Sequence, residues 1–96
     1  MHIISKKKIL DFVKNNPKSK SPLEYWYKIV NNTNFSNFDH LRRVFPSADQ
    51  VGKFTVFNIA GNNFRLIAAI HYNRSKIYIR HILTHREYDS EKWKEE

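Results

Sequence analysis

Four side chains in the second half of this sequence have the chemistry to act on a phosphodiester. Arg80, His85 and Tyr88 fall within the stretch YIRHILTHREYD, and Arg65 lies in the apolar run before it. Guanidinium groups match phosphate oxygens and stay charged. Histidine can take or give a proton near neutral pH, and tyrosine can donate a proton or stack on a base. We interpret these four as candidate catalytic residues.

Each of these residues also has a simpler interpretation. A histidine at the end of a strand is more often a surface or capping residue. Two arginines on a sheet face can each cover apolar surface or pair with a carboxylate. The three strands that we predict below contain no Asp or Glu, so an anion held between the arginines is the favoured explanation.

The pattern of apolar residues predicts an α+β domain in which two or three helices precede a small sheet. MHII fits a short first strand, and SKKKILDFVKNN has one apolar helical face. A second helix is expected to begin at SPLE, with Ser21 as the N-cap and Glu24 completing a capping box. SNFDHLRRVF repeats this logic, with Ser36 and Asp39 as the cap pair and Pro46 ending the helix.

After these helices the sequence changes to three β-branched and aromatic runs, KFTVFNIA, NFRLIAAIHY and KIYIRHILT. Turn signals at Gly61-Asn62 and Asn73-Arg74 predict an antiparallel meander. A two-residue turn at the second site, or a four-residue loop of the same register, pairs Leu66 with His81. The face expected to form the core carries Phe57, Ile59, Phe64, Leu66, Ala68, Ile70, Ile77, Ile79 and Leu83, together with His81 as an interior histidine.

The opposite face of this predicted meander is polar. It carries Asn58, Arg65, His71, Tyr78, Arg80 and Thr84. Arg80 is expected across from Ile67 and diagonal to Arg65, about 7–8 Å away at the backbone. Two arginines on one face favour a clamp for a phosphate group.

Length and composition limit the class of protein. We expect a single domain over residues 1–96. Its 17 Lys+Arg against 9 Asp+Glu give a formal net charge of +8, which indicates a polyanionic partner, either nucleic acid or a membrane surface. The membrane is disfavoured because no apolar run approaches the ~18–20 residues of a span, and the start does not read as a signal peptide. A cytoplasmic location is expected.

The composition and spacing of the residues also disfavour metal and cofactor chemistry. The chain has no cysteine, and its five histidines show no metal-ligand spacing. The carboxylates that a two-metal nuclease needs are not clustered, and two glycines do not make a phosphate-binding loop. We therefore expect no metal and no cofactor. The set of residues suits RNA cleavage through the ribose 2′-hydroxyl, which DNA lacks.

The segments VFPSADQV, FTVFNIAGNNFRLIAAIHYNR and YIRHILTHREYDSEKW closely resemble HigB-type toxins of bacterial type II toxin–antitoxin systems. The resemblance is strong over residues 39–93. It implies a RelE/ParE-like fold, with helices packed on a small antiparallel or mixed sheet and MHII as the edge strand. The positions that match the family's basic and polar cluster are Arg65, Arg80, His85 and Tyr88, with Asn58 beside them.

The resemblance also implies an activity and partners. Such toxins are mRNA interferases that enter the ribosomal A site and cut the messenger. A HigA-type antitoxin with a helix-turn-helix domain neutralises the toxin. Further residues are expected to bind RNA, namely Asn58, Lys53, Arg42, Arg43, Arg74 and Lys76, and lysines of the first helix and its following loop are expected to contact ribosomal RNA in a salt-dependent manner.

Two other functions stay open on the sequence. A ParE-like toxin would poison DNA gyrase and leave mRNA intact. A non-catalytic RNA-binding module would use aromatic side chains on an exposed sheet face, for which only Phe54 and Tyr78 qualify. In the tail SEKWKEE, Trp93 is the side chain expected to dock on the body of the domain.

Overall fold

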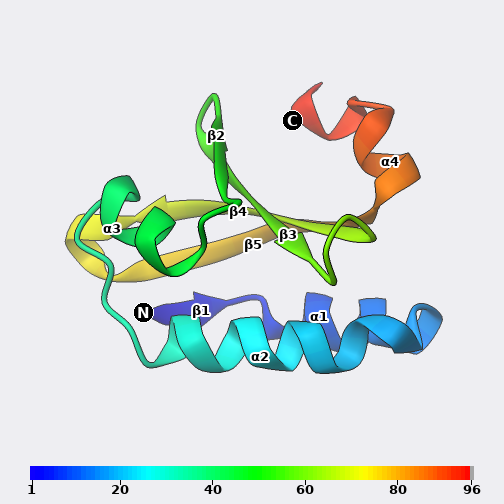
Figure 1. Ribbon diagram of the computed structural model, residues 1–96, viewed down its shortest axis with the longest axis horizontal. Coiled ribbons are helices and arrows are strands. Elements are labelled where there is room, and N and C mark those ends of the chain that lie inside the picture. The colour runs from blue at the N-terminus through cyan, green and yellow to red at the C-terminus, as the bar shows by residue number, and fades with distance from the viewer. Residues whose placement is uncertain (96) are drawn as a thin grey trace.

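A five-stranded mixed sheet lies at the centre of the molecule, with strand order β1-β5-β4-β3-β2 (Figure 1). The computed structural model describes residues 1–95. Its strands are β1 (His2–Ile4), β2 (Asp49–Val51), β3 (Phe54–Ile59), β4 (Phe64–His71) and β5 (Lys76–Thr84). Its helices are α1 (Lys6–Asn15), α2 (Lys20–Asn31), α3 (Phe38–Val44) and α4 (His85–Asp89), with 3₁₀ turns at Pro17–Ser19, Tyr72–Arg74 and Lys92–Glu95.

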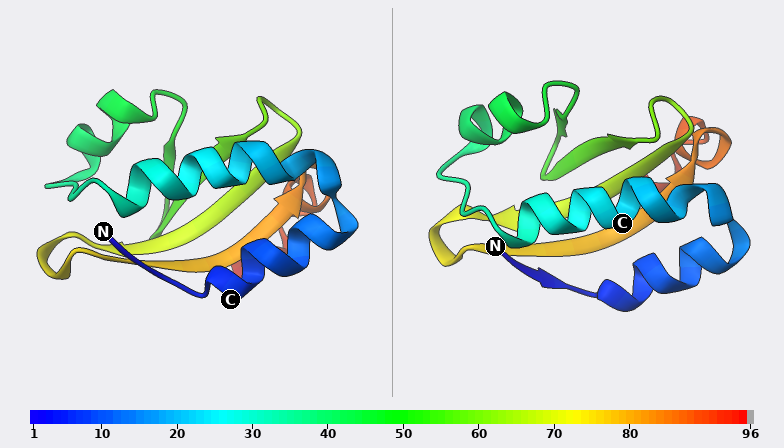
Figure 2. Two further views of the ribbon diagram at one scale, coloured as in Figure 1. Left: turned by 90° about the horizontal axis from the view of Figure 1, so that it is seen from below. Right: turned by 60° about the horizontal axis from the view of Figure 1, so that its bottom comes forward.

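The predicted α+β class is confirmed, and so is MHII as an edge strand. β1 pairs with β5 in parallel, and all other neighbouring strands are antiparallel. Helices α1 and α2 cover one face of the sheet, whereas α4 lies on the other face (Figure 2). The amino group of Met1 donates to the carbonyl oxygens of Val30 and Thr33, at 2.9 and 2.7 Å, and so joins the start of β1 to the end of α2.

The main core lies between the sheet and α1, α2 and α3. Trp26 of α2 and Phe45, just after α3, each meet Phe57 of β3 edge to face, with ring centroids 5.4 and 5.2 Å apart. The apolar face of α1 contributes Ile9 and Phe12. None of the helices in residues 1–95 is long and apolar enough to cross a membrane.

The caps predicted for two helices were wrong. Helix α2 begins at Lys20 because the chain has already turned at Pro17–Ser19, so Ser21 lies inside the helix instead of capping it. The actual N-cap, Ser19, is buried and its hydroxyl donates to the Asn16 carbonyl oxygen at 2.6 Å.

Helix α3 is capped by Asn37 and not by the expected pair Ser36 and Asp39. The Asn37 side chain accepts a hydrogen bond from the His40 backbone N–H at 2.8 Å. Asparagine is as good an N-cap as serine. Asn37, one residue after the expected Ser36, has the extended backbone of an N-cap. The helix ends at Val44, before Pro46 as expected.

Most of the predicted strand register is confirmed. Ile59 pairs with Phe64, and Ala68 with Ile79. Four residues join β4 to β5, the longer of the two loops considered. Strand β2 was not predicted. It pairs with β3 through a tight turn at Gly52-Lys53. Gly52 has a positive φ of 59°, a conformation that glycine adopts without strain.

A bulge in β5 overturns the last part of the predicted register. Ala68 pairs with Ile79, but the preceding residue of β4, Ile67, pairs with His81. Arg80 is therefore the extra residue, and Leu66 faces Ile82 instead of His81. A bulge of this kind reverses the alternation of every residue that follows it.

Three predicted orientations were consequently wrong. His81 leaves the core face and lies half-buried on the outer face of the sheet, opposite Ile67. Leu83 also turns outward and packs in a second apolar cluster, while Ile82 takes a place in the main core. Thr84, expected on the outer face, is opposite Phe64 and caps α4.

The second cluster fastens the C-terminal segment to the outer face. Phe54, Val56 and Ile67 of the sheet pack with Trp93, which is 5% exposed. The predicted docking of Trp93 is confirmed. Phe54 is buried by this contact, so one of the two aromatic side chains that an exposed RNA-binding sheet would need is covered.

Replacing Trp93 by alanine should lower the free energy of unfolding by about 3 kcal/mol, since the lost indole leaves a cavity against Phe54. Trp93→Phe keeps an aromatic ring and should cost about 1.5 kcal/mol at most. Urea titrations followed by circular dichroism would measure both. An alanine variant as stable as the wild type would show that the C-terminal segment is not held by this contact.

Candidate active site

Arg65 lies in β4 beneath the C-terminal segment. It pairs with Asn58 of β3, as predicted, and with Leu83 of β5. Its side chain is only 8% exposed. One guanidinium nitrogen donates to the Phe64 carbonyl oxygen at 3.1 Å and the other to the side-chain oxygen of Asn62 at 3.3 Å.

Arg65 is the first member of a stack that ends at Trp93. Its guanidinium carbon lies 5.3 Å from the centre of the Tyr88 ring, and Tyr88 in turn stacks on Trp93 with centroids 5.3 Å apart and planes inclined by 15°. The Trp93 indole N–H donates to the Tyr88 carbonyl oxygen at 3.0 Å. The Tyr88 ring thus contacts both a guanidinium and an indole, and these two contacts orient it.

Helix α4 starts where β5 ends because of a capping box. The Thr84 hydroxyl accepts from the Glu87 backbone N–H, and the Glu87 carboxylate accepts from the Thr84 backbone N–H at 2.9 Å. The His85 backbone N–H donates to the Asn63 carbonyl oxygen at 3.1 Å, which ties the helix to the β3–β4 loop. The letters T-H-R-E carry this signal, although no helix was predicted at this point.

His85 forms a pair with Asp89 that sequence reasoning missed. The two residues lie one helical turn apart, and Nδ1 of His85 is 2.8 Å from a carboxylate oxygen of Asp89. Their side chains are 51% and 60% exposed. The carboxylate assigns the proton to Nδ1, so that Nε2 is left as the acceptor. The i, i+4 spacing on a capped helix was the available signal.

Arg80 is not beside Arg65, contrary to prediction. As the bulge residue it is followed by His81 opposite Ile67, and it lies three residues before Leu83, the partner of Arg65. Three residues of strand span about 10 Å. Its carbonyl oxygen accepts from the Lys8 ammonium at 3.2 Å. The backbones of the two arginines are therefore farther apart than the predicted separation of about 7–8 Å.

The residues predicted to bind RNA are dispersed. Asn58 lies beside Arg65 on the sheet. Lys53 is in the β2–β3 turn, with its ammonium 5.2 Å from the Phe54 ring centre. Arg42 and Arg43 belong to α3, Arg74 lies in the β4–β5 connection, and Lys76 is the first residue of β5 after it. Both α3 and that connection lie at the end of the molecule away from α4 (Figures 1 and 2).

Within residues 1–95, His, Asp and Glu side chains form no group of three or more that could hold a metal ion. The His85–Asp89 pair stands without a third such ligand. What the site offers is proton transfer at an exposed histidine, a half-buried tyrosine one turn of helix away, and arginines on the adjoining strands.

Comparison with known proteins agrees with this fold and site. The model of the HigB toxin family, described as the RelE-like toxic component of a toxin–antitoxin system, matches residues 19–91. A protein named mRNA interferase HigB from Escherichia coli O6:H1 is 34% identical over 92 residues, which cover 93% of this chain and 89% of that protein. The mRNA interferase toxin HigB of Escherichia coli K12 is 35% identical over 93% of this chain and 88% of its own length.

These matches cover nearly the whole chain at an identity that shows common descent. The chain belongs to the HigB toxin family, the RelE-like toxic components of toxin–antitoxin systems. Membership of this family implies an antitoxin as its partner. The resemblance noted from the sequence is confirmed.

Arg65→Lys should release Tyr88 from its stack, because an ammonium is a point charge and does not lie flat on a ring while donating to two oxygens. The ring resonances of Tyr88 and the indole N–H resonance of Trp93 should move toward their values in unstructured peptides. NMR spectra would record the shifts. Arg74→Lys, the same change at an exposed arginine, is the control and should leave them in place. Unmoved Tyr88 resonances in Arg65→Lys would show that the arginine does not position this ring.

Proposed function

We propose that this chain is an mRNA interferase, an endoribonuclease that cuts translated mRNA through the ribose 2′-hydroxyl. The observation that carries the proposal is the His85–Asp89 pair, solvent-exposed on α4 and 2.8 Å apart. It supplies a histidine oriented by a carboxylate, the arrangement that general base catalysis requires. Family membership and the names of the relatives, both mRNA interferases, support the same activity.

The proposed reaction needs only groups of the protein and the RNA. Nε2 of His85 removes the proton from the 2′-hydroxyl, and the 2′-oxygen attacks the adjacent phosphorus. The bond from phosphorus to the 5′-oxygen breaks, which yields a 2′,3′-cyclic phosphate and a 5′-hydroxyl end. We assign the proton received by the departing oxygen to the Tyr88 hydroxyl, since positions i and i+3 of a helix are neighbours.

The two arginines have different parts in this proposal. Arg65 is a positioning residue, because its guanidinium is buried, donates to Phe64 and Asn62, and lies 5.3 Å from the centre of the Tyr88 ring. Arg80 is half-buried at the bulge and is the arginine proposed to hold the phosphate as charge develops. The RNA-binding roles of Asn58, Lys53, Arg42, Arg43, Arg74 and Lys76 remain predictions.

The partners follow from the same proposal. The toxin acts in the cytoplasm, in the A site of the ribosome, where translated mRNA is presented. Its antitoxin is of the HigA type with a helix-turn-helix domain. The net charge of +8 favours both the ribosomal RNA and an acidic surface on the antitoxin.

The activity can be tested by mapping new 5′ ends on a reporter mRNA after a short pulse of expression. Wild type should produce new ends within translated codons. In His85→Ala and Arg80→Ala these ends should fall by at least about tenfold, because proton transfer and phosphate stabilisation each contribute more than that.

The matched control is Lys28→Ala, which removes an exposed cation on α2 far from α4 and should cut like the wild type. Growth arrest with intact mRNA would contradict the proposal. Damage to DNA in that case would identify a gyrase poison of the ParE kind instead.

Asp89→Asn should slow cleavage by about tenfold without loss of the fold, because the amide no longer stabilises the imidazole in its charged form. The rate would be measured in a cell-free translation mixture programmed with the reporter mRNA. Glu91→Gln removes an equal charge two residues away, from a carboxylate that pairs with Lys94, and should keep the wild-type rate. Equal rates for both variants would remove Asp89 from the mechanism.

A further inference from the structure

A cationic groove runs along the outer edge of β5 and ends at α4. It consists of three adjoining hollows of about 280, 350 and 530 Å³, all of which include His81. Lys8 and Arg80 line the first two, and Lys92 lines the third. We call these hollows together the β5 groove.

The groove exists because the edge strand β1 is short. Its pairing with β5 ends at Tyr78, before the part of β5 that lines most of the groove. The bulge at Arg80 then distorts this edge, and the Lys8 ammonium bonds the Arg80 carbonyl oxygen at 3.2 Å. A bulged edge does not accept an added strand in register, and the groove therefore offers side chains to a ligand.

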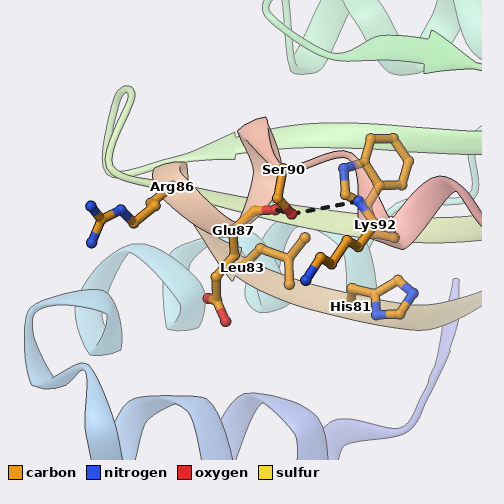
Figure 3. Close-up of a pocket in the computed structure, with 7 residues that line it drawn as sticks. His81, Leu83, Arg86, Glu87, Ser90 and Lys92 are labelled. Atoms are coloured by element: carbon orange, nitrogen blue, oxygen red, sulfur yellow. Dashed lines mark hydrogen bonds between the residues drawn. The ribbon is translucent and has the colours of Figure 1, made fainter.

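Positive charge predominates along the groove. Among residues 1–95, Lys8, Arg80, Arg86 and Lys92 line it, together with the carboxylates of Asp11 and Glu87. The carboxylate of Glu87 is held by the backbone N–H of Thr84 in the capping box. In Figure 3 the Lys92 side chain points over β5 toward Leu83 and His81, whereas Arg86 points outward.

We propose that the β5 groove binds the single-stranded RNA next to the scissile phosphate, with Lys8 and Lys92 contacting consecutive parts of its backbone. The inference rests on the proposed function, because Arg86 and Glu87, which follow His85 in α4, line the third hollow. From Tyr78 to Thr84 the strand measures about 20 Å, so a run of several nucleotides lies along it. The charge fits phosphates, and the bulge disfavours an acidic protein strand.

The test uses a fluorescent RNA oligonucleotide with 2′-O-methyl groups, which binds but lacks the attacking hydroxyl. Anisotropy titrations of the full chain would compare wild type with Lys8→Gln and Lys92→Gln. Each variant should bind about threefold more weakly near physiological salt, and the dependence of log K on log salt should become shallower by about 0.7 per lost phosphate contact.

The variants are chosen to separate charge from structure. Lys8→Gln keeps a donor for the Arg80 carbonyl oxygen while removing the charge. Lys7→Gln is the matched control, since Lys7 is the neighbouring exposed lysine of α1 and lies outside the groove. Circular dichroism spectra would confirm that all variants fold.

Unchanged binding in both groove variants, or equal weakening in Lys7→Gln, would overturn the proposal. A poly-glutamate peptide that displaces the RNA as well as unlabelled RNA does, with the same sensitivity to Lys8→Gln, would also overturn it and assign the groove to an acidic protein. If the wild type cuts mRNA but the groove variants bind RNA normally, only the proposed role of the groove is contradicted. If the groove binds RNA but mRNA stays intact in cells, only the proposed function is contradicted.

Discussion

The extra residue in β5 is the constraint on which the site depends. Because the register of β5 shifts at Arg80, Ile82 packs into the main core and Leu83 into the second cluster. Without the bulge, Leu83 and His81 would both lie on the core face of the sheet. The bulge therefore decides which apolar layer Ile82 and Leu83 each enter. It also leaves His81 at the surface of the groove and distorts the edge beyond Tyr78.

The second cluster sets the position of the residues proposed to do chemistry. Trp93 is buried against Phe54 and stacks on Tyr88, whose ring also contacts the Arg65 guanidinium. A buried arginine requires partners for its donors, and Phe64 and Asn62 provide them. The same segment covers the outer face of the sheet. This placement argues against an RNA-recognition surface made of exposed sheet aromatics.

The exposed part of the site is small and local. His85 and Asp89 lie on a helix of five residues, which is too short to be stable alone. Its capping box and the bond from His85 to the Asn63 carbonyl oxygen attach it to the ends of β5 and the β3–β4 loop. Packing through Tyr88 completes the attachment. The strands thus orient the pair proposed to transfer a proton, and the pair remains exposed to solvent.

The sequence alone determined the class of fold, the turns of the meander, most of its register and the family. These depend on local signals, such as alternating apolar residues and the Gly61-Asn62 turn, which neighbouring residues suffice to specify. Thr84 and Glu87 carry a local signal of the same kind for the start of α4, although no helix was predicted there. Only the tertiary structure decided the bulge. The extra residue is favoured because Ile82 then packs in the main core and Leu83 in the second cluster, and neither cluster can be seen from the sequence of one strand. For the same reason the separation of Arg65 from Arg80 followed from packing between distant segments.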